Sequence, residues 1–173
     1  MLTFAEDNRE HLARWAPPEP SGYYTEEFWR SYVVGARNEF VLGRALKLVL
    51  FDLKEPDGPV LGECNFSNII RGPFHACFLG YKIDHRYEGY GLMLEALSAA
   101  IAYSFDVLRL HRVMANYVPT NERSGRLLRR LGFTVEGFAR DYLLIDGEWR
   151  DHILTSLINV KLTPDELLRK IEV

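Results

Sequence analysis

The apolar residues at the start of the chain recur at helical spacing. Residues 4–15 predict one helix, which a cluster of prolines ends. A second helix is predicted from Thr25 toward Gly43, because Thr25 offers a capping hydroxyl and two glutamates follow it in the first turn. Two short helices therefore open the chain.

Three apolar segments come next, and turn residues separate them. Residues 46–52, 60–68 and 74–84 have the composition of strands, while Pro-Asp-Gly-Pro at 56–59 and Arg-Gly-Pro at 71–73 mark turns between them. Because both connections are short, the three strands are predicted to form an antiparallel meander.

The middle of the chain switches back to helical spacing. Residues 91–108 are apolar on nearly every face, which is typical of a helix packed closely against a sheet. Residues 111–118 predict a further strand. Residues 120–131 predict a helix with a leucine-bearing side, which Gly132 ends as a C-terminal cap.

The last part of the chain contains a strong hairpin signal. Residues 133–145 and 148–158 predict two strands that pair across the Asp-Gly pair at 146–147. Pro164 then opens a short tail helix. The predicted order is helix, helix, three strands, helix, strand, helix and two strands before the tail, an α+β arrangement in a single domain over residues 1–173.

Composition narrows the class of protein. The 173 residues are 47% apolar and 26% charged, which suits one globular domain with a sizeable core. No apolar run approaches the roughly 20 residues that span a bilayer, and the N-terminus lacks the features of a secretion signal. We therefore expect a cytoplasmic protein without a membrane partner.

The cysteines and charges exclude further classes. Cys64 and Cys77 have no partners at metal-ligand spacing, so they are predicted to be core thiols and no metal site is expected. The net charge of −3 argues against a broad nucleic-acid surface. Four arginines on the helix at 120–131 form a local basic cluster, which is best interpreted as a solvated helix face unless a phosphate lies beside it.

A glycine-containing motif, R-x-x-G-x-G, stands between the third strand and the apolar helix. It runs from Arg86 to Gly91. Its glycines allow successive backbone N–H groups to turn toward one point, where the following helix adds its positive N-terminal end. The motif predicts an anion site, although glycine pairs before helices are also common as simple turns.

These features together resemble the GNAT N-acetyltransferase superfamily, and within it the Rim branch. The resemblance rests on R-x-x-G-x-G, on Asn-x-x-Ser followed by Leu-Gly-Phe, and on the segments NFSNIIRGPFHACFLGY and DYLLIDGEWRDH. It implies a central, mixed but mostly antiparallel sheet with a splayed strand pair, flanked by helices. Members open with an additional strand that carries an Arg-Leu-x-Leu-Arg type pattern, whereas this sequence begins at the helix that follows it.

The resemblance also implies acetyl-CoA as co-substrate, bound where the strand ending at Asp84 splays from the strand at 111–118. Its pantetheine arm would pair with the first of these strands, and its pyrophosphate would lie in the glycine motif. The residues implied for cofactor binding are Leu79, Tyr81, Ile83, Arg86, Tyr87, Glu88, Gly89, Tyr90, Gly91, Asn116, Asn121 and Ser124.

The chemistry that the resemblance implies is direct attack of an amine on the thioester, with a backbone N–H near Leu79 or Gly80 holding the oxyanion. Ser124 is the first candidate for the acid that protonates the departing thiolate, ahead of Tyr117 and Tyr142. On residue type alone, Asn121 and Ser124 also fit a simple helix cap. Members of the family often have a glutamate on the strand before the motif, but residues 78–81 of that strand read Phe-Leu-Gly-Tyr here, without a carboxylate. The candidates for positioning a water as base are therefore Glu63, Asp141 and Asn65.

The acceptor implied by the resemblance is the N-terminal alanine of a ribosomal protein. That protein would be the partner, and this chain would act as a monomer or homodimer without direct nucleic-acid contact. Two alternatives stay open at this point: a GNAT enzyme that acts on a small-molecule amine, and a non-catalytic acetyl-CoA-binding module.

Overall fold

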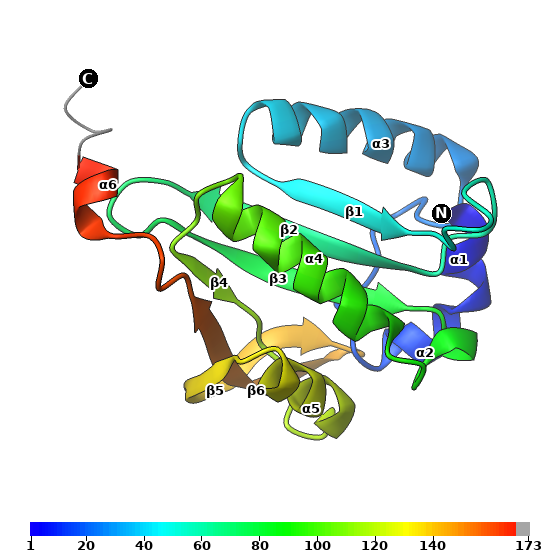
Figure 1. Ribbon diagram of the computed structural model, residues 1–173. Helices are drawn as coiled ribbons and strands as arrows, with labels where there is room; N and C mark the ends of the chain where they lie inside the picture. Colours follow the sequence, from blue (N-terminus) through cyan, green and yellow to red (C-terminus); the bar gives the residue numbers. More distant parts are fainter. Residues whose placement is uncertain (169–173) are drawn as a thin grey trace.

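The computed structural model describes residues 1–168. It is built around one six-stranded sheet, whose strands are drawn as arrows in Figure 1. The strand order is β1-β2-β3-β4-β6-β5. All neighbours are antiparallel except β3 and β4, which run parallel. The strands are β1 (Leu46–Leu50), β2 (Gly62–Ile70), β3 (Ala76–Ile83), β4 (Arg112–Met114), β5 (Thr134–Ile145) and β6 (Glu148–Ile158).

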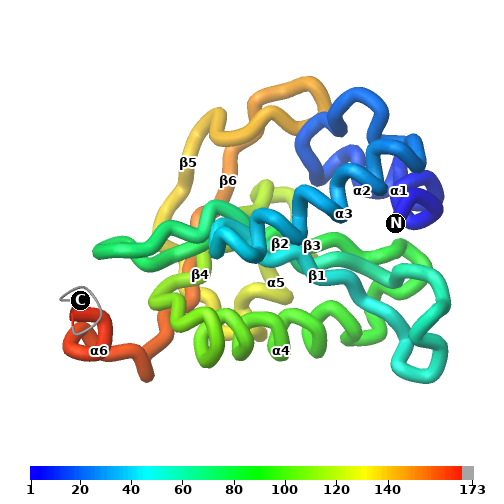
Figure 2. The backbone as a smooth tube through the Cα atoms, turned by 90° about the horizontal axis from the view of Figure 1, so that it is seen from above, coloured from blue at the N-terminus to red at the C-terminus, as the bar shows by residue number. Residues whose placement is uncertain are grey.

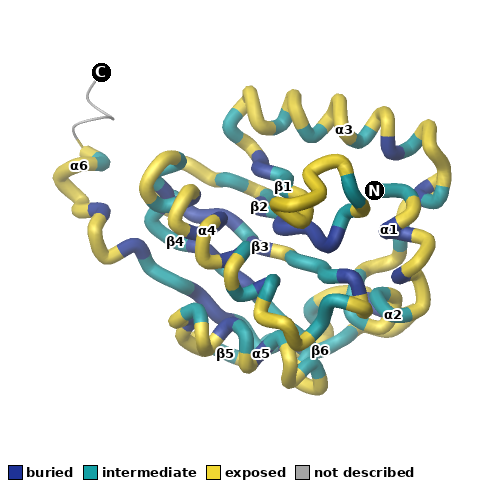
Figure 3. Tube along the Cα trace, turned by 45° about the vertical axis from the view of Figure 1, so that its right-hand side comes forward, coloured by how far each residue is buried: buried dark blue, intermediate teal, exposed yellow. Residues whose placement is uncertain are grey.

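Helices cover both faces of this sheet. Seen from above, α4 lies on one side of the sheet and α1 to α3 lie on the other (Figure 2). Much of α3 is exposed to solvent, whereas the centre of the sheet is buried (Figure 3). The helices are α1 (Leu2–Asp7), α2 (Arg9–Ala13), α3 (Glu26–Val41), α4 (Leu92–Asp106), α5 (Glu122–Arg130) and α6 (Pro164–Leu168).

The observed order confirms the predicted α+β fold, including the three-strand meander and the final hairpin. At the hairpin turn, Asp146 and Gly147 both have positive φ, the geometry that Asp-Gly pairs favour. The tail helix is present over Pro164–Leu168, and the rest of that predicted segment lies outside the described residues. No helix within residues 1–168 is long and apolar enough to cross a membrane.

Two predicted elements differ from the structure. The helix expected over 4–15 is two helices, because the chain bends at Asn8, whose buried side chain donates a hydrogen bond to the Phe4 carbonyl. The strand expected over 111–118 is regular only over Arg112–Met114. Beyond Met114 the main chain of this segment no longer pairs with β3, but it stays hydrogen-bonded to β6, at Ala115 and through a bridge between Tyr117 and Ile153.

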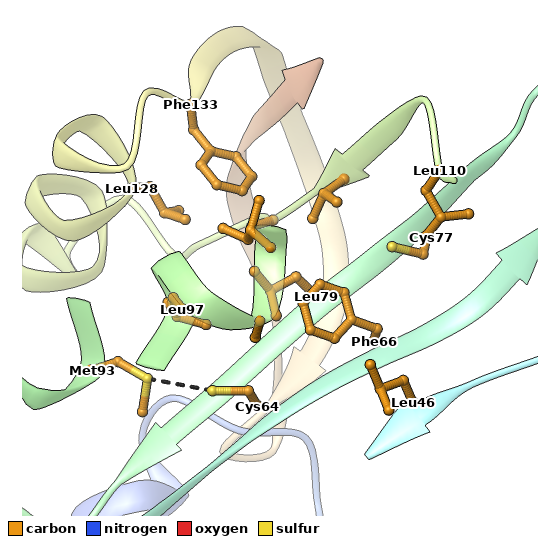
Figure 4. Close-up of a cluster of buried hydrophobic side chains, with 14 residues drawn as sticks. Leu46, Cys64, Phe66, Cys77, Leu79, Met93, Leu97, Leu110, Leu128 and Phe133 are labelled. Carbon is orange, nitrogen blue, oxygen red and sulfur yellow. Dashed lines mark hydrogen bonds between the residues drawn. The ribbon is translucent and has the colours of Figure 1, made fainter. Parts of the chain in front are cut away.

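The main core lies between the sheet and α4, with α5 packed on the same cluster (Figure 4). Leu97 of α4, Leu128 of α5 and Phe66 of β2 are almost completely buried there. Both cysteines lie in this core as free thiols, and burial raises each thiol pKa to about 12. They serve as packing residues, as the sequence predicted, because a thiol with so high a pKa is a poor nucleophile at neutral pH.

Candidate functional site

The candidate site begins where β3 and β4 separate. Their parallel pairing ends at Phe78 and Met114, although β3 continues to Ile83. The Asp84 N–H bonds the Leu61 carbonyl beside β2. Since backbone groups alternate along a strand, the N–H and C=O groups of Tyr81 and Ile83 face away from β2, into the gap between β3 and β4.

Main-chain groups that face a gap need hydrogen-bond partners. An extended ligand running beside β3 would supply them, as an added strand does. Tyr81 and Ile83 thus line the gap with their main-chain groups, and Leu79 lies at the point where the gap opens. Their binding of pantetheine stays a prediction.

The segment after β3 is a tight turn that leads into α4. Asp84 caps a single 3-10 turn over His85–Tyr87 by accepting a hydrogen bond from the Arg86 N–H. Gly89 and Gly91 both have φ of +84°, and Gly91 is the N-cap of α4. Residues with side chains rarely adopt this φ, so the two glycines fix the path of the loop.

The two halves of this loop differ in how their N–H groups are used. The N–H groups of Arg86, Tyr87 and Glu88 bond within the turn. The next six N–H groups along the chain have no acceptor among the described residues. They are those of Gly89, Tyr90, Gly91, Leu92, Met93 and Leu94. These six donors, at the positive end of a 15-residue helix, make an anion cradle.

The side chain of Arg86 links the loop to residues outside it. Its guanidinium bonds both carboxylate oxygens of Asp84, and it also pairs with Asp7 of α1 at 3.1 Å. The hydrogen bond from Arg86 lowers the pKa of the Asp84 carboxyl to about 2 despite its burial. Arg86 therefore holds the turn and α1 together.

Two further polar contacts join the loop to the N-terminal helices. Buried Asn8 accepts a hydrogen bond from the His85 N–H. The carboxylate of Glu88 lies 3.0 Å from the His11 ring and also pairs with Arg123 of α5. Although burial opposes ionisation, the bond from Arg123 and the neighbouring His11 lower the Glu88 pKa, so the carboxylate stays ionised and Arg123 balances its negative charge beside the cradle.

Asn121 and Ser124 lie at the start of α5. The Asn121 side chain accepts a hydrogen bond from the Ser124 N–H and caps the helix. The Ser124 hydroxyl lies 2.7 Å from the hydroxyl of Tyr81 on β3. The cap and the gap-lining strand are thus joined directly, which the sequence reasoning did not foresee.

Tyr117 and Asn116 occupy the segment that leaves β4. The ring of Tyr117 lies against Gly125 so closely that a Cβ on that glycine would be 2.8 Å from the ring. Asn116 donates to the Tyr142 hydroxyl at 3.1 Å and accepts from the Thr155 N–H. Tyr117 is therefore brought beside α5, whereas Asn116 ties the β5–β6 hairpin to the segment after β4.

The carboxylates proposed for the base lie elsewhere. Glu63 on β2 is buried and lies 3.7 Å from the ammonium group of Lys82, which also bonds Glu19. Asp141 is exposed on β5, and its N–H bonds Asp151. Within the described residues neither carboxylate forms a hydrogen bond with Ser124 or Tyr117, and no cluster of three metal-ligating side chains occurs in this part of the chain.

Sequence reasoning missed four residues that shape the site: Asn8, His11, Lys82 and Gly125. The first three act through partners distant in sequence, so no local pattern marks them. Gly125 left a weak signal, because a glycine inside a predicted helix calls for a packing reason.

Comparison with known proteins gives a consistent result. Residues 2–134 match the family model described as an acetyltransferase (GNAT) domain. The chain is 49% identical over 165 residues to [ribosomal protein uS5]-alanine N-acetyltransferase of Escherichia coli, covering 95% of this chain and 84% of that protein.

Solved structures agree with the sequence match. The ribosomal-protein-S5-alanine acetyltransferase of Vibrio fischeri superposes with a TM-score of 0.90 at 39% identity, covering 94% of this chain and 88% of that one. RimJ of Mycobacterium smegmatis, in complex with CoA-disulfide, gives a TM-score of 0.85 at 28% identity, covering 99% of this chain and 81% of that one.

Proposed function

The chain belongs to the GNAT acetyltransferase family as an acetyl-CoA-dependent N-acetyltransferase, and on that premise we propose that it acetylates the N-terminal alanine of ribosomal protein uS5. The observation that carries the proposal is the 49% identity to a uS5-alanine acetyltransferase over 95% of this chain. Its similarity to enzymes disfavours a non-catalytic binding module. The acceptor of the relative is a ribosomal protein, so uS5 is the partner proposed here.

The cradle is proposed to bind the pyrophosphate of acetyl-CoA. Six N–H groups without a protein acceptor, together with the N-terminal end of α4, suit a diphosphate. Tyr81 and Ile83 are proposed to pair with the pantetheine arm through their main chains. Residues 86–88 build the loop rather than donate their own N–H groups, which their internal hydrogen bonds already use.

The proposed reaction is a direct transfer. The free amine attacks the thioester carbonyl, the oxyanion is held by a backbone N–H, and the thiolate leaves. Of the two candidates for that donor, Gly80 shares the backbone orientation of Asp84 toward β2, whereas Leu79 faces β4 at the last step of the parallel pairing. Ser124 is proposed to protonate the thiolate, with Tyr117 nearby as the second candidate.

The base requirement is modest for an N-terminal acceptor. An α-amino group with a pKa of about 7.7–8.0 costs about 1.2 kcal/mol to deprotonate at pH 7, against about 4.6 kcal/mol for a lysine side chain. Water positioned by Asn65, Glu63 or Asp141 therefore suffices in the proposed reaction. The Glu63 carboxylate is already paired with Lys82, which weakens it as a base.

A substrate comparison tests the proposal. The protein is mixed with acetyl-CoA and a peptide that begins with the N-terminal alanine sequence of uS5, and release of free thiol is followed. The matched control is the same peptide with a blocked N-terminus and an internal lysine, and a third arm contains polyamines. We expect acetylation of the free N-terminus alone, whereas acetylation confined to polyamines would contradict the proposal.

A further inference from the structure

A hydrogen bond joins two hydroxyl groups at the edge of the gap between β3 and β4. The Tyr81 hydroxyl on β3 lies 2.7 Å from the Ser124 Oγ on α5, although the residues are 43 positions apart. The backbone of Tyr81 faces the gap, while Ser124 stands in the first turn of the helix that Asn121 caps. The contact therefore connects the proposed pantetheine strand to the proposed acid.

The chemistry of the two groups suggests which one donates. A serine hydroxyl carries one hydrogen and two acceptor lone pairs, so it can accept one bond while its own hydrogen points elsewhere. Burial raises the pKa of Tyr81 to about 12, and the phenol thus keeps its proton throughout the neutral range. A protonated Tyr81 is able to donate to Ser124 at every pH at which the enzyme works.

Packing keeps the two hydroxyls at this separation. Gly125, next to Ser124, is buried against the ring of Tyr117, where a Cβ would lie 2.8 Å from that ring. The absent side chain lets α5 approach the segment after β4 closely. Since Tyr117 is itself bridged to Ile153 of β6, the start of α5 rests on a fixed support.

We propose that Tyr81 is a positioning residue for proton delivery: its hydroxyl donates to Ser124 Oγ and turns the Ser124 hydrogen toward the sulfur of the departing thiolate. This inference rests on the proposed function and its assignment of Ser124. In the step, the carbon–sulfur bond breaks with its electron pair on sulfur, and the Ser124 proton passes to sulfur. The proton lost by the attacking amine restores the Ser124 hydroxyl through solvent.

A purely structural role for the hydrogen bond makes different predictions. If the bond only docked α5 on β3, its loss would lower stability or weaken acetyl-CoA binding, and kcat would stay unchanged. A positioning role lowers kcat through Ser124 alone. A double-mutant cycle in kcat, read beside the KM for acetyl-CoA, separates these cases, because two groups that act as a unit in the chemical step give non-additive effects on kcat.

The experiment compares Tyr81→Phe, Ser124→Ala and the double variant, with kcat and the KM for acetyl-CoA measured on the best acceptor amine. We expect Ser124→Ala to lower kcat on the order of 10- to 100-fold and Tyr81→Phe to lower it about 3- to 10-fold. The double variant should match Ser124→Ala. The KM for acetyl-CoA should stay within about twofold, since neither change removes a main-chain donor.

Tyr103→Phe is the matched control, because Tyr103 is 38% exposed on α4 and lies outside the proposed site. Ser124→Thr keeps a hydroxyl and should keep its sensitivity to Tyr81→Phe. Independent losses that multiply in the double variant, a raised KM with unchanged kcat in Tyr81→Phe, or an unaffected Ser124→Ala would each overturn the inference. Failure of the proposed acceptor would show separately, as a wild-type enzyme active only on another amine.

Discussion

The loop at residues 84–94 and the region around Ser124 use different kinds of groups: main-chain N–H groups in the loop and side chains around Ser124. Residues 84–94 form a main-chain site, in which two glycines set the path of the loop and six N–H groups have no protein acceptor. The Ser124 region is a side-chain site, in which Ser124 of α5 bonds Tyr81 of β3, while Tyr117 from the segment after β4 packs against Gly125. The first should determine whether acetyl-CoA binds, and the second should determine how fast it reacts.

The largest effect that tests this division is expected from the loop glycines. Gly89→Val combined with Gly91→Val forces β-branched residues to a φ of +84°, although both positions have open space around them. At roughly 1–2 kcal/mol for each residue, the strain should weaken acetyl-CoA binding on the order of 100-fold or displace the loop. Titration calorimetry with acetyl-CoA measures it.

The matched control for this variant is Gly72→Val. Gly72 also has positive φ, +71°, and open surroundings, but it lies in the turn before β3, at the opposite end of that strand from the loop. It should lose stability without losing affinity for acetyl-CoA. Equal losses of affinity in the control and the double variant would mean that strain in general, not the cradle, limits binding.

The next prediction concerns the loss of folding stability at low pH and assigns part of that loss to the loop. The Arg86 hydrogen bond lowers the Asp84 pKa to about 2, so this carboxylate contributes stability that is fully present above about pH 4. The contribution, about 2 kcal/mol at most, is lost as pH falls from about 4 toward 2. Urea unfolding of the wild type and of Asp84→Asn at pH 6 and pH 3 measures it.

The expected result is a smaller decline of stability with acid in Asp84→Asn than in the wild type. The variant is less stable at pH 6, because an amide cannot replace the charged partner of Arg86. Glu26, which pairs with Arg30 on the exposed surface of α3, offers a control through Glu26→Gln. If both variants lost the same pH dependence, the acid sensitivity could not be assigned to the loop.

The two regions also differ in how far the sequence predicted them. The loop was predictable because a glycine often marks a position where the backbone needs a positive φ. The motif R-x-x-G-x-G therefore indicates the loop geometry without reference to distant residues. The bond between Tyr81 and Ser124 was not, since residues 43 positions apart meet only once β3 and α5 are placed. The same reason hid Asn8 and His11, whose partners lie 77 positions away.

For the fold, too, local features were predictable and features that depend on distant residues were not. Periodicity and turn residues predicted the order of strands and helices, but not where β4 stops, because that depends on the divergence of β3. Arg86 shows the limit for site residues. Its position in the motif is evident from the sequence, but its pairing with Asp7 of α1 and with Asp84 after β3 is not.

The smallest expected effect on stability comes from Gly125→Ala, and it tests the side-chain region alone. The new Cβ would lie 2.8 Å from the Tyr117 ring, so either the ring or α5 must move. Overpacking of this kind costs about 1–3 kcal/mol, and the better helix propensity of alanine offsets about 1 kcal/mol of it. We expect a net loss near 1 kcal/mol with kcat lowered about 10-fold, as Ser124 shifts relative to Tyr81.

Gly35→Ala makes the same exchange in α3, where no atom lies within 4 Å of the new Cβ. It should raise stability by up to about 1 kcal/mol, since only helix propensity changes. Urea unfolding, kcat and acetyl-CoA affinity are measured on both variants. If Gly125→Ala weakened acetyl-CoA binding while kcat stayed normal, α5 would belong with the loop at residues 84–94 in controlling binding, and the division between the two regions would fail.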